Sequence, residues 1–346
     1  MEWYAKTKLQ RQNLIRWRRK MLKVVLPDAY RLTTGDYSIE QEIFKENGMA
    51  FFIENCKTEE EVIEKCKDAD AVITIYSDIN PNVISKLEKC KVLVRYGIGY
   101  DNINVKAATE KNIFVCNIPD YCIDEVATHT AALILALERK IMVYDRSVRN
   151  GEWDEYKGYP VHSLNTQILG LLGFGNIARE TAKMLRPFGF SIIAYDPYLN
   201  DDIFKNAGVK RVDLDQLWTI SDVISVHVPL TDHTRHIINK ESIAKMKKTV
   251  MVVNTSRGPI IDLVDLVAAL KGGKILAAGL DVLENEPLRD KNAEILKLDN
   301  VIITPHAAFN TVESSQALHR KVAETVCQVL KGERPSNIVN KELIKR

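Results

Sequence analysis

Gly170-Leu-Leu-Gly-Phe-Gly-Asn-Ile-Ala178 is the stretch of this 346-residue chain that decides the fold, because it closes an apolar run with the pattern GxGxxG/A. Gly173 allows a tight turn, Gly175 lets the backbone approach a pyrophosphate, and the small Ala178 lets a following helix pack close to its strand. The first turn of that helix presents unpaired N–H groups and the positive end of its dipole to phosphate. The pattern therefore predicts a dinucleotide-binding turn, rather than a Gly-rich turn that serves packing alone. The residues expected to contact the cofactor here are Gly173, Phe174, Gly175, Asn176 and Ile177.

The kind of dinucleotide is indicated by Asp196, which ends the next apolar run, 23 residues after Gly173. A carboxylate at that place accepts hydrogen bonds from the adenosine ribose hydroxyls and repels a 2′-phosphate. We therefore expect the cofactor to be NAD rather than NADP.

Two series of short apolar runs alternate with helical stretches from Leu22 onward. Near-continuous apolar strands that alternate with helices are typical of parallel sheets covered on both faces. The sequence therefore predicts an α/β protein with two doubly wound parallel-sheet domains. Longer helices are expected from Asp124, as the cap, to about Asn150, with Gly151 as the stop, and over about 312–330. The first series comprises residues 22–26, 50–53, 71–75, 92–95 and 113–115, and the second comprises 168–173, 190–196, 222–228, 250–255, 275–281 and 300–305.

Charge and composition exclude several classes of function. Of the 48 basic and 46 acidic residues, seven basic and one acidic lie in residues 1–20, which leaves a net charge of −4 for the rest. An acidic body is a poor partner for nucleic acid, whose phosphates demand a basic face. No apolar run approaches the roughly 18 residues that cross a bilayer, and the six cysteines show neither a CxxC pair nor zinc-ligand spacing. We expect a cytoplasmic protein with reduced thiols, no metal, and no nucleic-acid or membrane partner.

Residues 1–20 admit two interpretations. They are Arg-rich and acid-poor, as transit peptides are, but they contain no Ser. Alternatively they are a leader outside the fold, since the first strand is expected to begin at Leu22. On the second interpretation, their deletion leaves the activity intact.

More motifs lie on both sides of the glycine turn. They are Gly97-Ile-Gly99-Tyr-Asp101-Asn102, Gly151-Glu-Trp153, Asn254-Thr-Ser-Arg257-Gly258, Asp281-Val-Leu-Glu-Asn-Glu286-Pro287 and Thr304-Pro305-His306. Together, in this order and at this spacing, they resemble the D-isomer-specific 2-hydroxyacid dehydrogenase family over about residues 22–340. Asp196-Pro-Tyr-Leu and Pro305-His-Ala-Ala look most like the branch of the C-terminal-binding-protein corepressors and their bacterial enzyme relatives.

The resemblance implies an architecture and a set of cofactor contacts. Residues 1–119, completed by 310–346, would form a flavodoxin-like substrate domain, and residues 120–309 would form a Rossmann NAD-binding domain. A homodimer would form through about residues 124–165. The residues that would border the nicotinamide and the phosphates are Val228, Pro229, Thr234, Thr255, Ser256 and Asp281.

Reduction of a 2-oxo acid requires a proton for the carbonyl oxygen as hydride reaches the carbon. His306, at the C-terminal end of a strand, is the candidate donor. Glu286 against its other ring nitrogen would keep the imidazolium charged near neutral pH, and Arg257 would hold the substrate carboxylate and polarise the carbonyl. The predicted catalytic residues are thus Arg257, Glu286 and His306, and the expected substrate contacts are Arg95 and the N–H groups around Gly97, Ile98 and Gly99.

Three positions set this chain apart from its relatives. Asn176 stands where the family often has Arg, which weakens or removes one phosphate contact. Phe309 stands where the animal corepressors have a Trp that touches the substrate, which leaves the shape of the substrate open. Glu286 argues against a formate dehydrogenase, which has Gln at that place.

The sequence favours an NAD-dependent D-2-hydroxyacid dehydrogenase. It would interconvert a small 2-oxo acid, of the glyoxylate or hydroxypyruvate type, and its D-2-hydroxy acid. An NAD(H)-sensing scaffold of the corepressor type is a second hypothesis, and it predicts NADH-dependent peptide binding without turnover. A D-3-phosphoglycerate dehydrogenase is a third, and it requires a basic subsite for the phosphate beyond Arg95 and Arg257.

Overall fold

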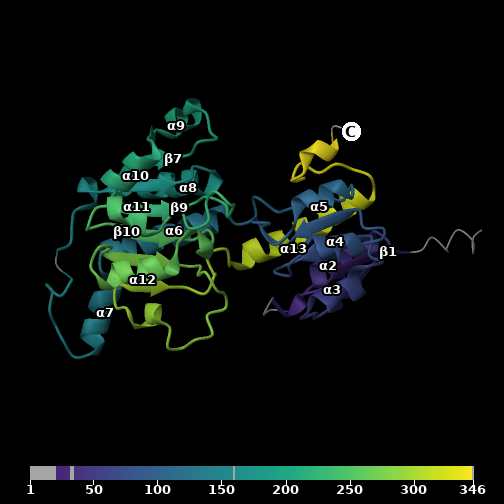
Figure 1. Ribbon diagram of the computed structural model, residues 1–346, viewed down its shortest axis with the longest axis horizontal. Coiled ribbons are helices and arrows are strands. Elements are labelled where there is room, and N and C mark those ends of the chain that lie inside the picture. Colours follow the sequence, from purple (N-terminus) through teal and green to yellow (C-terminus); the bar gives the residue numbers. More distant parts are fainter. Residues whose placement is uncertain (1–20, 32–34, 159, 345–346) are drawn as a thin grey trace, which may run out of the picture. The chain divides into compact units, whose positions relative to one another are not determined.

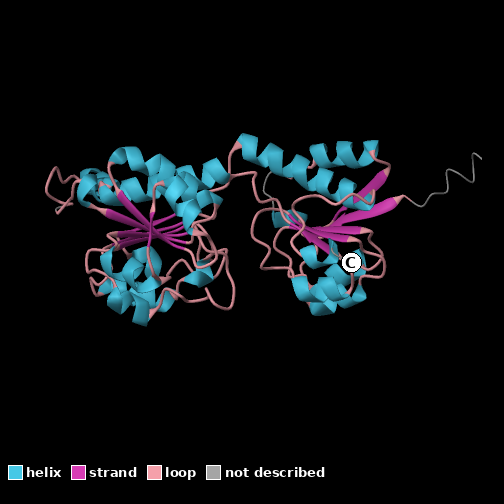
Figure 2. Cartoon of the chain, turned by 90° about the horizontal axis from the view of Figure 1, so that it is seen from above, coloured by secondary structure: helices cyan, strands magenta, loops and turns pink. Residues whose placement is uncertain are grey.

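The computed structural model describes residues 21–31, 35–158 and 160–344, so both interpretations of residues 1–20 lie outside the described residues. The described chain divides into two compact units (Figure 1). The discontinuous unit extends to Tyr121 and resumes at Ser315, and the central unit is Cys122–Ser314. In each unit, helices cover both faces of one sheet (Figure 2).

The discontinuous unit is built on a five-stranded sheet in the order β2-β1-β3-β4-β5, in which every paired strand is parallel. This is the strand order of a flavodoxin-like fold. Successive residues of β1 serve opposite faces: Val24 and Leu26 pack with α13, whereas Val25 packs with α3 and α4. The strands are β1 (Leu22–Leu26), β2 (Met49–Ile53), β3 (Ala71–Thr74), β4 (Val92–Arg95) and β5 (Phe114–Cys116), and the helices are α2 (Ser38–Glu46), α3 (Glu59–Cys66), α4 (Pro81–Lys86), α5 (Val105–Glu110) and most of α13 (Val312–Leu330).

The central unit is built on a seven-stranded parallel sheet in the order β12-β11-β10-β9-β6-β7-β8. Its order reverses between β6 and β9, and in such sheets ligands bind at that switch point, outside the carboxyl ends of the strands. The strands are β6 (Ile168–Leu172), β7 (Ser191–Tyr195), β8 (Lys210–Arg211), β9 (Val223–Val226), β10 (Met251–Asn254), β11 (Ala277–Leu280) and β12 (Val301–Ile303), and the helices are α6 (Ile123–Glu138), α7 (Ile141–Arg149), α8 (Asn176–Leu185), α9 (Asp201–Ala207), α10 (Leu214–Ile220), α11 (Lys240–Lys245) and α12 (Leu263–Lys271).

These two sheets confirm the predicted α/β class with two parallel-sheet domains. Most of their strands are buried because side chains pack against helices on both sides, and buried parallel strands have no polar face. The helix predicted over 312–330 is confirmed as α13.

The single helix predicted from Asp124 to Asn150 is wrong. It is broken into α6 and α7 by Lys140, whose backbone is left-handed with φ of 54°. The N–H groups of Arg139 and Lys140 donate to the carbonyls of Leu135 and Leu137, which closes α6 as a left-handed C-cap does. Asp124 is not the cap either, because that position is Cys122, and Asp124 lies in the first turn of α6.

Candidate active site

Two glycines, one within β6 and one in the turn that follows it, leave no room for a side chain. Gly173 has φ of 92°, and a Cβ there would lie 2.9 Å from the backbone carbon of His227. A Cβ on Gly170 would lie 2.2 Å from Ser221 Oγ, so this residue lets β6 pack closely on α10. The turn is anchored by the Gly173 N–H, which donates to the Tyr195 carbonyl at 2.8 Å.

Gly175 differs, because a Cβ at this position would meet no atom within 4 Å. It caps α8, whose first N–H groups lack partners within the helix. Open space beside a helix N-terminus is what a pyrophosphate needs. Asp196 lies next to this turn, since its two carboxylate oxygens accept the N–H groups of Phe174 and Tyr198, both at 3.0 Å. Each oxygen keeps a second lone pair for a ribose hydroxyl, so the residues present fit a dinucleotide.

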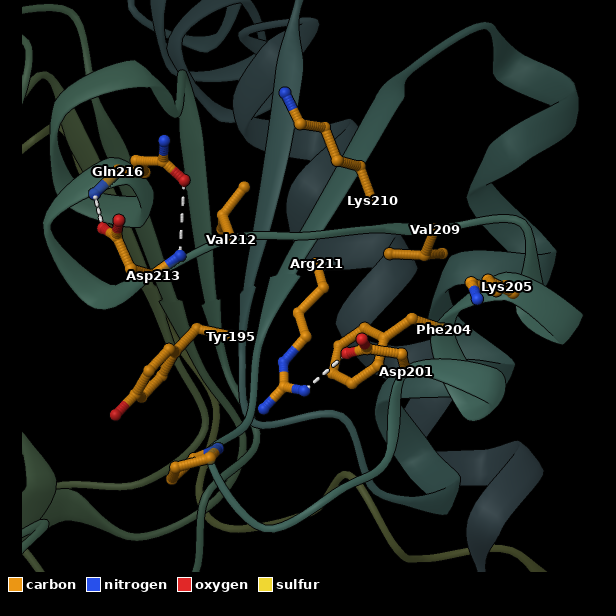
Figure 3. A pocket seen from close by; sticks show the side chains of 11 residues that line it. Tyr195, Asp201, Phe204, Lys205, Val209, Lys210, Arg211, Val212, Asp213 and Gln216 are labelled. Atoms are coloured by element: carbon orange, nitrogen blue, oxygen red, sulfur yellow. Dashed lines mark hydrogen bonds and ion pairs between the residues drawn. The ribbon is translucent and has the colours of Figure 1, made fainter.

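A pocket of about 700 Å³ opens beyond Asp196, between β7, β8 and α9 (Figure 3). Arg211 extends along it and pairs with Asp201 at 2.6 Å, and it donates to the Asp196 carbonyl oxygen at 3.1 Å. The pocket also presents Lys205 and Lys210. Because Asp201 compensates the charge of Arg211, the arginine beside Asp196 is a weaker partner for a 2′-phosphate than an unpaired arginine.

Asn176, which stands where the family often has Arg, is in contact with another arginine, Arg179. The side-chain oxygen of Asn176 accepts from the Arg179 guanidinium at 2.5 Å, and Arg179 also donates to the Phe174 carbonyl at 2.8 Å. The Arg179 guanidinium therefore lies beside the phosphate-binding turn, although Arg179 stands three residues after Asn176.

The loops after β9 and β10 are tied to each other. Ser256 Oγ donates to the Val228 carbonyl at 2.5 Å, and Thr234 Oγ1 donates to the Pro229 carbonyl at 2.6 Å. Thr255 shares a 2.8 Å hydrogen bond with Thr130 of α6. The structure thus brings the predicted residues after these two strands together, at the carboxyl edge of the sheet.

His306 and Glu286 are in direct contact, although they follow different strands. His306 Nδ1 lies 2.7 Å from Glu286 Oε2, and Glu286 Oε1 accepts the Leu283 N–H at 2.8 Å. Both side chains are partly exposed, at 22% and 32%. Since Nδ1 faces the carboxylate, the ring nitrogen that would reach a substrate is Nε2.

Asp281 organises the loop that carries His306. Its carboxylate, which is buried, accepts the N–H groups of Ala307 and Ala308 at 2.8 and 3.0 Å and the Thr304 hydroxyl at 2.6 Å. Its carbonyl accepts the His306 N–H at 2.7 Å. His306 is held in a left-handed conformation with φ of 55°, which is uncommon for a residue with a side chain. In this structure Asp281 therefore supports the His306 backbone.

His129 of α6 completes this network, although its sequence context predicts no functional role. Its Nε2 lies 2.9 Å from Thr304 Oγ1 and 3.6 Å from Asp281 Oδ1. The available signal was a polar pair, His129-Thr130, directly before the apolar stretch of α6. Such a pair marks a contact, but it cannot show that the partners lie 175 and 125 residues away.

Arg257 follows β10 and is partly buried. It donates to the Ser256 carbonyl at 2.8 Å, and its own carbonyl accepts from Asn254 Nδ2 at 2.8 Å. The next residue, Gly258, packs so closely on the Leu283 backbone that a Cβ would lie 2.0 Å from its carbonyl carbon. This contact joins the Arg257 segment to the segment that positions Glu286.

The predicted substrate residues Arg95 to Gly99 lie in the discontinuous unit, directly after β4. Arg95 is buried, and its guanidinium folds back to donate to the Tyr96 carbonyl. Gly97 makes room for it, because a Cβ there would lie 1.7 Å from Arg95 Nη1. The Gly97 N–H already donates to the Arg95 carbonyl at 2.9 Å. Of the three N–H groups predicted to bind the substrate carboxylate, those of Ile98 and Gly99 therefore remain the candidates.

The central unit thus belongs to a definite class: a dinucleotide-binding α/β domain with a histidine–carboxylate pair at the ligand-binding edge of its sheet. Residues 131–308 match the family model described as D-isomer specific 2-hydroxyacid dehydrogenase, NAD binding domain. The chain belongs to the D-isomer-specific 2-hydroxyacid dehydrogenase family. This confirms the predicted family and the predicted cofactor, NAD, whereas the narrower corepressor branch stays a prediction.

Individual relatives carry different names. The chain is 45% identical over 287 residues to a D-3-phosphoglycerate dehydrogenase of Methanocaldococcus jannaschii, a match that covers 82% of this chain but only 54% of that relative. It is 39% identical over 289 residues to a glyoxylate reductase of Korarchaeum cryptofilum, covering 82% of this chain and 86% of the relative. A crystal structure of D-lactate dehydrogenase from Aquifex aeolicus, complexed with NAD and lactic acid, superposes with a TM-score of 0.80 at 30% identity, covering 93% of this chain and 97% of that one.

Neither a membrane-spanning helix nor a metal-ligand cluster occurs among the described residues. None of their helices combines the length and the hydropathy that a membrane span requires. No group of three or more metal-ligating side chains is found among them.

Proposed function

We propose that this protein is an NAD-dependent oxidoreductase that interconverts a small 2-oxo acid and its D-2-hydroxy acid, with His306 as acid and base. The observation that carries the proposal is the 2.7 Å contact between His306 Nδ1 and Glu286, at the carboxyl edge of a sheet that has a dinucleotide turn. A histidine oriented by a carboxylate is the arrangement that proton transfer to a carbonyl oxygen needs.

The reaction divides the work between cofactor and protein. When bound, the reduced nicotinamide supplies the hydride that adds to the substrate carbonyl carbon. His306 Nε2 donates a proton to the carbonyl oxygen, which becomes the hydroxyl, and in the reverse direction the same nitrogen accepts it. Glu286 holds the Nδ1 side of the ring and stabilises the imidazolium. Arg257 binds the substrate carboxylate and polarises the carbonyl.

We assign the domains as the sequence predicts. Residues 120–309 are the NAD-binding domain, and residues 1–119 with 310–346 are the substrate domain. The strand orders support this assignment, because the central sheet has the Rossmann order and the other sheet the flavodoxin-like order. Within the substrate domain, Arg95 and the N–H groups of Ile98 and Gly99 are proposed to bind the substrate.

Glyoxylate or hydroxypyruvate is the proposed type of substrate, and the relative from Korarchaeum cryptofilum carries the name glyoxylate reductase. A steady-state panel of 2-oxo acids, each with NADH and with NADPH, tests this. Turnover of glyoxylate or hydroxypyruvate with NADH is expected. NADH binding without turnover of any acid in the panel would contradict the proposed activity.

A D-3-phosphoglycerate dehydrogenase is the second candidate, favoured by the 45% identity to the enzyme of that name. The same panel separates the two candidates when it includes 3-phosphohydroxypyruvate. Preferred turnover of the phosphorylated acid, by a kcat/KM well above that for hydroxypyruvate, would establish the second candidate. A basic subsite for the phosphate would then have to exist in addition to Arg95 and Arg257.

A homodimer in a reducing, cytoplasmic environment is also proposed. All six cysteines are buried and free, which fits a compartment that keeps thiols reduced. The region after α6 exposes large apolar side chains, with Trp153 at 88% and Tyr156 at 70%, and a cluster of this kind marks a protein contact. Sedimentation of the wild type against Trp153→Asp tests the dimer, which the variant should weaken.

A further inference from the structure

Three side chains of the discontinuous unit meet in its core, and we call them the Glu40 cluster: Glu40, Tyr96 and His319. Glu40 lies in the first turn of α2, Tyr96 directly follows β4, and His319 belongs to α13. Glu40 Oε1 accepts from the Tyr96 hydroxyl at 2.5 Å and lies 2.7 Å from His319 Nδ1. The Tyr96 ring also meets the His319 ring edge to face, with centroids 5.4 Å apart.

The Glu40 carboxyl is unusual because it is completely buried, with an exposed fraction of 0%. Its second oxygen, Oε2, has no hydrogen-bond partner in the described structure. A buried carboxyl with an unsatisfied oxygen destabilises a fold, because its desolvation is not compensated. Stability therefore does not explain why Glu40 is present, since an apolar side chain would fill the same core without that penalty.

Tyr96 connects this cluster to the predicted substrate loop, residues 95–99. Its N–H donates to the Thr74 carbonyl at 2.8 Å, and its carbonyl accepts from Arg95. Burial and the nearby Glu40 carboxylate both raise the pKa of Tyr96, which keeps its hydroxyl protonated as a donor. The ring of Tyr96 is thus fixed at its hydroxyl end, while its backbone carries Arg95 on one side and Gly97 on the other.

We propose that Glu40 and His319 are positioning residues for the substrate loop, and that they act through the Tyr96 hydroxyl. The proposal rests on the proposed function, because it assigns the loop to the substrate carboxylate. With the hydroxyl anchored, the ring fixes the backbone at residue 96 and so the direction of the Arg95 guanidinium and of the N–H groups at Ile98 and Gly99. Loss of the anchor should loosen substrate binding and leave NADH binding unchanged.

Steady-state kinetics on Tyr96→Phe and Glu40→Gln test the proposal. Tyr96→Phe should raise KM for the 2-oxo acid about tenfold to a hundredfold, because small misplacements of binding groups have effects of that size. KM for NADH should not change. Tyr96→Phe removes both contacts of the hydroxyl, with Glu40 Oε1 and with His319 Nδ1. Glu40→Gln weakens only the first, so it should raise KM by a smaller factor. The double variant should be no worse than Tyr96→Phe, because the hydroxyl that Glu40 holds is already absent there.

Tyr37→Phe is the matched control. Tyr37 packs in the same core and touches the His319 ring, but its hydroxyl donates to the Ala29 carbonyl at 2.9 Å, away from residues 95–99. It should lower the melting temperature by a similar amount without changing KM for the acid. If KM instead follows the melting temperature across all three variants, the cluster is structural and the proposal is wrong.

Hydrogen exchange of the peptide that contains residues 95–99 gives a second readout that needs no turnover. Faster exchange in Tyr96→Phe and Glu40→Gln, but not in Tyr37→Phe, is expected. Unchanged exchange in both cluster variants would overturn the positioning role, even in an active enzyme. A wild type that turns over no 2-oxo acid would instead contradict the proposed function, and the exchange data would still show whether the cluster orders the loop.

Discussion

His306 holds a left-handed backbone conformation, which is uncommon for a residue with a side chain. A left-handed residue with a side chain is stabilised here by its surroundings: the Asp281 carbonyl takes the His306 N–H, and the Asp281 carboxylate takes the next two N–H groups. Strain of this kind persists only where neighbouring groups over-determine the backbone, and it concentrates at functional sites. The conformation is thus an independent reason to place the acid–base group at His306.

Some of this site could be predicted at the scale of single residues, and some could not. Asp196, Glu286 and His306 stand at fixed distances from recognisable motifs, so their sequence spacing carried the information. The contact of His129 with Thr304 joins residues 175 positions apart, so the sequence around either residue does not predict it. The support that Asp281 gives to His306 was also missed, because it depends on how two loops after neighbouring strands meet.

We predict that the carboxylate of Asp196 sets the preference for NADH over NADPH. Asp196→Ser removes the charge that repels a 2′-phosphate, and it leaves Arg211 beside the ribose site. The ratio of kcat/KM for NADPH to that for NADH should rise by about a hundredfold, or about 3 kcal/mol, as one close charge pair near a surface allows. Kinetics with both cofactors measure it. Asp202→Ser, an exposed neighbour on α9, is the control, and an equal shift in that variant would refute the role of Asp196.

At the scale of elements, the glycines of β6 and of the turn before α8 have two separate roles, in packing and in cofactor binding. Gly175→Ala introduces a Cβ into open space at an ordinary φ of −68°, so the melting temperature should stay close to that of the wild type. NADH should bind about a hundredfold more weakly, because the methyl group occupies the phosphate position. Fluorescence titration with NADH measures the affinity.

Gly170→Ala is the counterpart within β6. Its Cβ would lie 2.2 Å from Ser221 Oγ, so it should lower the free energy of unfolding by about 1–3 kcal/mol and leave NADH affinity unchanged. Were the two variants to show the same pattern, the division between packing and binding glycines would be wrong.

The helices and strands show where local pattern is insufficient. The break between α6 and α7 falls at Arg139-Lys140, and neither residue is a glycine or proline that would mark a stop. The break is made by C-capping bonds and by the burial of each helix, which the sequence pattern does not display. β8 is two residues long, too short for an apolar run to reveal. The other strands were found because burial makes most of their residues apolar.

At the scale of the whole molecule, alternating strands and helices predicted two parallel sheets but not their strand order. In the central order the chain returns past β6 after β8, so that β9 pairs with the other side of β6. That order creates the switch point where the turn and the loops after β9 and β10 meet. The family resemblance supplied the Rossmann and flavodoxin-like assignments that composition alone could not.

The stability of the central unit should depend on pH through Glu138 at the end of α6. Burial raises the pKa of this carboxyl to about 7, and its Oε1 has no hydrogen-bond partner in the described structure. The unfolded chain releases the proton near its ordinary pKa, whereas the folded chain keeps it to about 7, so stability falls as pH rises between those values. From pH 5 to pH 8 the loss should be about 2–3 kcal/mol.

Urea unfolding of wild type and Glu138→Gln at both pH values measures the contribution of Glu138 to the free energy of unfolding. The variant should lack the loss, so that its stability relative to the wild type improves with rising pH. Glu241→Gln, an exposed carboxylate on α11, should follow the wild type. A parallel pH dependence in wild type and Glu138→Gln would show that Glu138 titrates like an exposed group.

The most direct test of the central claim is the comparison of wild type with His306→Ala, using glyoxylate or hydroxypyruvate and NADH. Loss of the general acid should lower kcat by about a thousandfold, with the NADH dissociation constant unchanged. His162→Ala, at an exposed position of the central unit, should behave as the wild type. Turnover by His306→Ala within about tenfold of the wild type would contradict the account, because a reaction that keeps its rate without this histidine takes its proton from elsewhere.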